Sequence, residues 1–119
     1  MTLTFTKMNG AGNDFVVMDN RDNALSLTQS QIAALCDRHR GVGADGVMLV
    51  EPTEGDAIAR MRYYNADGGE AEMCGNGARC FAKFVNRLHD HGLTELRFET
   101  MAGLIVATFP TDQGDVCVQ

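Results

Sequence analysis

The chain has 119 residues, of which 45% are hydrophobic, so it can build one compact domain with its own core but not two. We therefore expect a single domain over residues 1–119. The net charge of −6 and the lack of a basic cluster in the sequence argue against nucleic acid as a partner and favour a small-molecule ligand. No apolar run approaches the roughly 20 residues of a membrane helix, and no secretory signal is visible, which predicts a soluble, cytoplasmic protein without a membrane partner.

Short strands around one helix are predicted for the first half of the chain. Period-two alternation and apolar runs bounded by turn residues predict strands at residues 1–7, 15–19, 46–51 and 57–65. Thr28 and Gln31 form a capping-box signature, and apolar residues at helical spacing follow them. This pattern predicts a helix from Thr28 to Arg40, with Gly41 as its stop.

A second helix is predicted from Asn76 onward, with Gly92 as its stop. Its apolar stripe, which must be buried, has the spacing i, i+3, i+4, i+7 and i+10 and consists of Ala78, Phe81, Ala82, Val85 and Leu88. The remainder, from Thr94, alternates strands with glycine-containing turns, as in an antiparallel meander. The sum is an α+β domain in which one helix lies against a curved sheet.

The four cysteines are expected to be reduced, because no export signal and no C-x-x-C pair accompany them. The three histidines are not spaced with them as zinc ligands, so we expect no structural metal. For three of the cysteines we keep a structural interpretation, as small buried residues. These three are Cys36, Cys80 and Cys117.

Cys74 has a different setting, in the stretch NADGGEAEMCGNGAR just before the second helix. There the first backbone N–H groups have no helical partner and the helix dipole is positive, so a thiolate is stabilised and can take a proton near neutral pH. Glycines such as Gly75 leave the same N–H groups open to a carboxylate. The amides of Asn65 and Asn76 can both donate and accept, which suits an amino acid as ligand.

The residues by themselves leave structural alternatives open. A lone cysteine at a helix start is more often a small buried residue beside a tight turn. Asn13, in the turn GAGNDF, either aims its amide into a pocket or is a hairpin residue that tolerates the left-handed conformation. The G-x-G-x-x-G match in GVGADG follows a helix and precedes a strand, the reverse of the dinucleotide-binding order, and we reject it.

Three motifs in this order, KMNGAGNDF, RHRGVGADG and NADGGEAEMCGNGAR, resemble the N-terminal half of diaminopimelate epimerase. The resemblance covers essentially the whole chain, whereas enzymes of that family are about twice as long and consist of two similar halves. It implies a pair of pseudosymmetric domains, each a curved, mostly antiparallel sheet wrapped around a central helix, with the active site in the cleft between them. The chain is then the N-terminal catalytic half-domain, and the C-terminal half is its missing partner.

The activity that the resemblance implies is cofactor-free interconversion of LL- and meso-diaminopimelate, in the route to lysine and peptidoglycan. Cys74 matches one of the family's two catalytic thiols. Gly75 and Asn76 match residues whose backbone N–H groups hold the substrate, and Asn13 and Asn65 match side chains that contact it. Because an acid and a base must flank the α-carbon, we expect the chain alone to be inactive.

Alternatives from other classes are also considered. Proline racemases and phenazine-pathway isomerases share the implied fold, so the fold is better determined than the substrate. A thiol-redox domain using Cys74 and Cys80 is disfavoured, because six helical residues separate them by about 9 Å along the axis and place them on different faces. A noncatalytic assembly module, in which the exposed cleft face forms a homodimer, is the third alternative.

Overall fold

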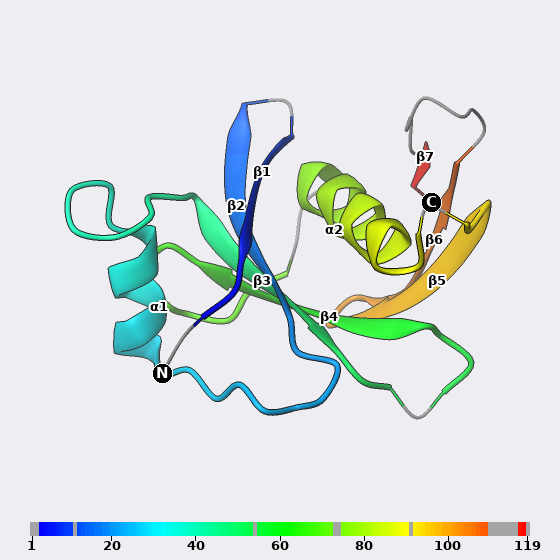
Figure 1. Cartoon of the computed structure of the whole chain (residues 1–119), viewed down its shortest axis with the longest axis horizontal. Helices are drawn as coiled ribbons and strands as arrows, with labels where there is room; N and C mark the ends of the chain where they lie inside the picture. The colour runs from blue at the N-terminus through cyan, green and yellow to red at the C-terminus, as the bar shows by residue number, and fades with distance from the viewer. Residues whose placement is uncertain are drawn as a thin grey trace.

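A single mixed sheet of seven strands and two helices make up the described part of the chain (Figure 1). The computed structural model describes residues 3–10, 12–53, 55–72, 75–90, 92–109 and 117–118. The helices are α1 (Gln29–Cys36) and α2 (Gly75–Leu88). The strands lie side by side in chain order: β1 (Thr6–Gly10), β2 (Asn13–Asp19), β3 (Gly46–Glu51), β4 (Ala59–Asn65), β5 (Glu95–Thr100), β6 (Gly103–Thr108) and β7 (Cys117–Val118). Neither helix in these ranges has the length and apolar character needed to cross a bilayer.

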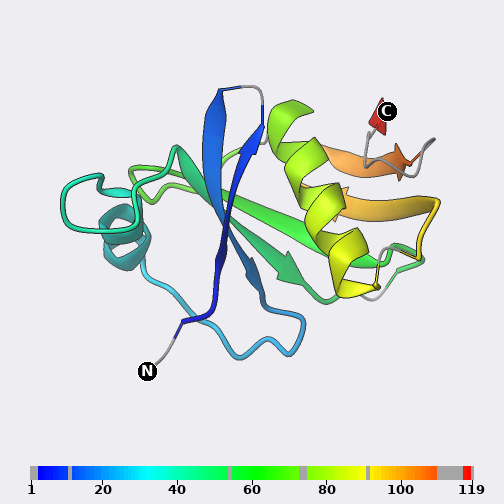
Figure 2. The same cartoon turned by 45° about the horizontal axis from the view of Figure 1, so that its top comes forward.

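The sheet is mostly antiparallel, which confirms the expected α+β class. Only β2–β3 and β4–β5 are parallel neighbours, while the remaining adjacent pairs are antiparallel. Each parallel pair is joined by a crossover that contains a helix, α1 in the first and α2 in the second, as parallel strands require. The sheet curls around α2, with β1 and β2 on one side of the helix and β5 and β6 on the other (Figures 1 and 2).

The strands β2 and β3 are buried on both faces, which explains their unbroken apolar runs FVVM and VMLV. Alternate side chains contribute to two separate cores. The core beneath α2 takes Phe15, Val17, Met48 and Val50. The core beneath α1 takes Val16, Met18, Val47 and Leu49.

The helix α2 is amphipathic, as its sequence predicts. Its buried positions are Gly77, Ala78, Cys80, Phe81, Ala82, Phe84, Val85 and Asn86. Phe81 packs against Phe98 of β5 with ring centroids 4.7 Å apart, which joins the helix to the second half of the sheet. On the opposite face Arg79, Lys83 and Arg87 are exposed at a spacing of four residues.

Several predicted element boundaries differ from the structure, and three of the differences have a clear physical reason. The helix α1 ends at Cys36 and not at Arg40, because Asp37 adopts an extended conformation and the chain folds back over the last turn. In that fold-back, the N–H of Gly43 donates to the carbonyl of Leu35 at 3.0 Å. Gly41 is therefore a close-approach position outside the helix, where an added Cβ would lie 2.0 Å from a helix carbonyl oxygen.

The other two differences concern α2 and the first hairpin. After α2 the left-handed residue is Asp90, at φ 58°, and not Gly92. The first strand begins at Thr6 and continues to Gly10, which pairs with Asn13. The connection is therefore a two-residue hairpin loop, shorter than the gap between the predicted strands at residues 1–7 and 15–19, and Gly12 in it has a positive φ of 100°.

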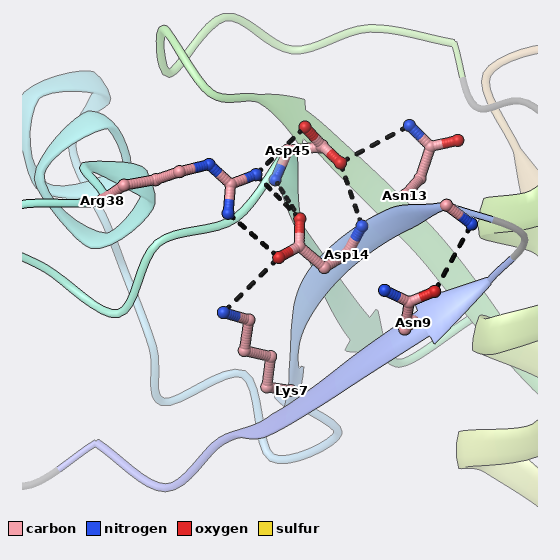
Figure 3. Close-up of polar contacts among 7 residues, drawn as sticks. Lys7, Asn9, Asn13, Asp14, Arg38 and Asp45 are labelled. Atoms are coloured by element: carbon pink, nitrogen blue, oxygen red, sulfur yellow. Dashed lines mark hydrogen bonds and ion pairs between the residues drawn. The ribbon is translucent and has the colours of Figure 1, made fainter.

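An ion cluster fixes the start of β2 to the loop that follows α1 (Figure 3). Both terminal nitrogens of Arg38 donate to the carboxylate of Asp14, at 3.0 and 3.1 Å, and Lys7 lies 3.4 Å from the same carboxylate. Arg38 also contacts Asp45 at 3.3 Å. The hydrogen bonds from Arg38 hold the pKa of Asp14 well below its ordinary value, against the opposing effect of desolvation.

The turn NADGG after β4 packs on the first turn of α1. Gly68 has a φ of 88°, and a Cβ there would lie 2.2 Å from the carbonyl oxygen of Gln29. The side-chain amide of Gln29 in turn donates to the carbonyl of Asp67. Only glycine satisfies both the backbone conformation and this contact.

Replacing Gly68 by alanine is expected to destabilise the chain by about 3 kcal/mol or more, because backbone strain and a clash with helix backbone add together. Gly12→Ala is the matched control, since Gly12 also has a positive φ but has open space around it. It should cost about 1 kcal/mol from strain alone. Urea unfolding curves of the two variants measure the difference, and equal losses would contradict the packing role of Gly68.

Replacing Arg38 by alanine is expected to weaken the dependence of stability on acid. Because the folded-state pKa of Asp14 is depressed, its contribution is fully present above about pH 4 and is lost as the pH falls toward the folded pKa. Arg38→Ala should lower the thermal midpoint at pH 7 and flatten its decline between about pH 5 and pH 2. Arg40→Ala, in the same loop, should keep the wild-type profile, and a steep acid decline in Arg38→Ala would refute this assignment.

Candidate active site

Three segments that carry predicted site residues meet at one end of the sheet. Phe15 of β2 pairs with Gly46 of β3, and Gly46 pairs with Asn65 of β4. Asn13 begins β2 and Asn65 ends β4, so both lie at this end. The first turn of α2 packs beside the β1–β2 hairpin at the same place (Figure 2).

Asn13 and Asn76 are in direct contact although 63 positions separate them in the chain. The side-chain amide nitrogen of Asn76 donates to the side-chain oxygen of Asn13 at 3.2 Å. The contact depends on Gly10, because an added Cβ there would lie 2.9 Å from the sulfur of Cys80 and 3.2 Å from the carbonyl oxygen of Asn76. The hairpin can therefore approach α2 only without a side chain at this position.

The other predicted site residues have different placements. Gly75 is the first residue of α2 and is exposed, with open space where a Cβ would stand. Asn65 is exposed as the last residue of β4, and within the described residues no hydrogen bond joins its side chain to Asn13 or Asn76. Cys74 lies outside the described residues, so its predicted position before the helix stays a prediction.

The remaining thiols are consistent with structural roles where they are described. Cys36 is buried in the core beneath α1, and desolvation raises the pKa of its thiol, which keeps it protonated. Cys80 is buried in the core beneath α2. The side chain of Cys117 lies outside the described part. Within the described ranges, no three side chains of His, Cys, Asp or Glu gather as metal ligands.

Folding creates a basic groove that the sequence patterns did not predict, and we define it by Arg79, Lys83 and Arg87. These residues, together with Asn76, line a cavity of about 490 Å³ between β1 and α2. The lack of a basic cluster in the linear sequence therefore does not extend to the folded surface, because α2 presents its three cations in one row beside β1. The four-residue spacing of those cations was the available signal.

Three solved structures share this fold. A probable proline racemase from Agrobacterium radiobacter aligns with a TM-score of 0.72 at 17% identity, over 98% of this chain and 41% of that one. A methylitaconate-delta-isomerase aligns with a TM-score of 0.72 at 14% identity, over 95% and 35%. A phenazine biosynthesis protein of the PhzF family from Bacillus anthracis aligns with a TM-score of 0.60 at 22% identity, over 98% and 38%. At these identities the likeness shows the fold, and it confirms the expected curved sheet around a helix.

Sequence relatives define the family. Diaminopimelate epimerase from Nitrosospira multiformis is 50% identical over 121 residues, which is 99% of this chain and 42% of the relative. The enzyme of that name from Burkholderia ambifaria is 54% identical over 123 residues, 99% of this chain and 41% of the relative. The chain thus spans about two fifths of the length of these relatives. Because the diaminopimelate epimerase family model matches residues 5–119, this chain belongs to the diaminopimelate epimerase family.

Proposed function

We propose that the chain is the N-terminal half-domain of a cytoplasmic enzyme that interconverts LL- and meso-diaminopimelate in the biosynthesis of lysine and peptidoglycan. The family membership and the named relatives at 50% and 54% identity support this substrate. The relatives extend well beyond the matched region, which supports a second half-domain as the missing partner. Self-association of this chain into a homodimer is a further prediction, which sedimentation can test.

The observation that carries the proposal is the hydrogen bond between Asn76 and Asn13. It joins two of the five predicted site residues at the first turn of α2, directly after Cys74 in the sequence. In the proposed site, the thiolate of Cys74 removes the proton from the α-carbon of the substrate. The backbone N–H groups of Gly75 and Asn76 hold its carboxylate at the positive end of α2, while Asn13 and Asn65 contact the remaining polar groups.

The proposed reaction needs a second half-domain on chemical grounds. Inversion requires a proton to leave one face of the α-carbon and another to arrive on the opposite face, so a second thiol must stand across the substrate. With no organic cofactor or metal in the proposed mechanism, the developing carbanion is stabilised by helix N-termini and by exclusion of water. A closed cleft supplies both, and this chain supplies one wall of it.

Fusion of the chain to the remaining C-terminal region of the Nitrosospira multiformis relative is expected to restore epimerisation, whereas the chain alone should give no turnover. The measurement is deuterium incorporation at the α-carbon in D2O, followed by NMR together with conversion of LL- to meso-diaminopimelate. Cys74→Ala in the fusion should reduce kcat/KM by about 10²- to 10⁴-fold, the usual contribution of a general base.

Cys36→Ala is the matched control, because that thiol is buried in the core beneath α1 and away from the proposed site. It should leave kcat/KM near the wild-type value. Turnover by the isolated chain, or equal effects of the two cysteine substitutions, would refute the proposed role of Cys74.

A further inference from the structure

We propose that Asp45 is a positioning residue that fixes the orientation of the Asn13 amide and, through it, that of Asn76. The inference rests on the proposed function only in assuming that these two amides line the substrate site. Asp45 stands just before β3, in the loop that follows α1, and is half-buried.

The carboxylate of Asp45 determines which way the Asn13 amide points (Figure 3). One of its oxygens, Oδ2, accepts from the backbone N–H of Asp14 at 2.9 Å and faces Nδ2 of Asn13 at 3.4 Å. An ionised carboxylate only accepts hydrogen bonds, so the NH2 end of the amide must face Asp45. The 3.4 Å contact lies at the long end of the hydrogen-bond range.

The orientation passes from Asn13 to Asn76. Because Nδ2 of Asn13 faces Asp45, its Oδ1 points the other way and can only accept. The Nδ2 of Asn76 donates a hydrogen bond to that oxygen at 3.2 Å. Its Oδ1 is then left to accept from Arg79 at 3.4 Å. Among the described residues, each amide uses one of its N–H hydrogens in this relay and keeps the other for a ligand.

Asp45 is itself held from two directions, which makes it a firm anchor. Its backbone N–H donates to the carbonyl of Asp14 at 2.8 Å. Its second oxygen, Oδ1, accepts a hydrogen bond from Arg38 at 3.3 Å, so Oδ2 remains directed at Asn13. Asp14 cannot take this role, because Arg38 and Lys7 occupy both of its oxygens. Arg38 thus supports the anchor and Asp45 makes the contact.

The consequence for binding is a lower cost of ordering the site. A side-chain amide held in one orientation before binding does not lose rotational freedom when the ligand arrives. Without Asp45, both amides can rotate and can present a carbonyl oxygen where an N–H is needed. The effect should be on substrate binding and not on the proton-transfer step.

The first test uses the 119-residue chain as it is and measures 15N relaxation of the side-chain amides. In the wild type both Asn13 and Asn76 should give high order parameters. In Asp45→Ala both should fall below about 0.6, the value typical of flexible groups. Asp45→Asn keeps a side-chain oxygen that can accept from Asn13, so it should rescue much of the order.

The matched control is Asp22→Ala, since Asp22 also accepts a backbone N–H, that of Ala24, but lies in the exposed loop after β2. It should leave both amides ordered. Wild-type order of Asn13 in Asp45→Ala would overturn the proposal, as would equal loss of order in Asp22→Ala. This test requires no catalytic activity.

The second test separates positioning from simple loss of fold, in the fusion to the relative's C-terminal region. Asp45→Ala should raise KM about tenfold, as expected for lost hydrogen bonding, and change kcat by less than about threefold. A purely structural effect would reduce the active fraction and lower the apparent kcat at unchanged KM, which would overturn the proposal. An inactive wild-type fusion would count against the proposed function, while the relaxation measurement decides the role of Asp45 independently.

Discussion

Burial of the apolar face of α2 within the curled sheet determines where every other part of this structure lies. Phe81 and its neighbours fill the space between β2, β3 and β5, so the axis of the helix is fixed relative to the strands. The N-terminus of α2 then lies at the sheet end where β2 and β3 begin and β4 ends. Core packing therefore also fixes the candidate site, because the residues proposed to bind a ligand stand at the end of a helix whose position the core determines.

The elements dominated by local pattern were predictable from sequence. The apolar stripe of α2 has helical period, and the capping box at Thr28 is present as predicted, with both of its hydrogen bonds formed. The errors occur where tertiary contacts override local signals. The helix α1 stops four residues early because the chain after Asp37 folds back onto its last turn, a contact that no sequence spacing reveals. Gly41 has the sequence pattern of a helix stop, but it lies outside the helix. Its lack of a side chain allows the chain to pass close to the last turn of α1.

The candidate site divides in the same way. Motifs identified Asn13 and Asn76 separately, and the fold brings them into contact across 63 positions. Asp45, Asp14 and Arg38 lie in the motifs as well, but their roles depend on which oxygen faces which nitrogen, and that information exists only in three dimensions. The basic groove was missed because its three cations stand four residues apart in the sequence and gather into one row only on the folded helix. The net charge of the whole sequence, −6, does not reveal a local concentration of positive charge of this kind.

The absence of a side chain at Gly10 determines how closely the β1–β2 hairpin approaches α2. A single methyl group there would meet both a sulfur and a backbone oxygen of α2, so the hairpin would have to pivot outward. The hairpin can therefore lie this close to α2 only because residue 10 has a hydrogen atom in place of a side chain. A substitution at this position would therefore separate Asn13 from Asn76 without replacing either residue.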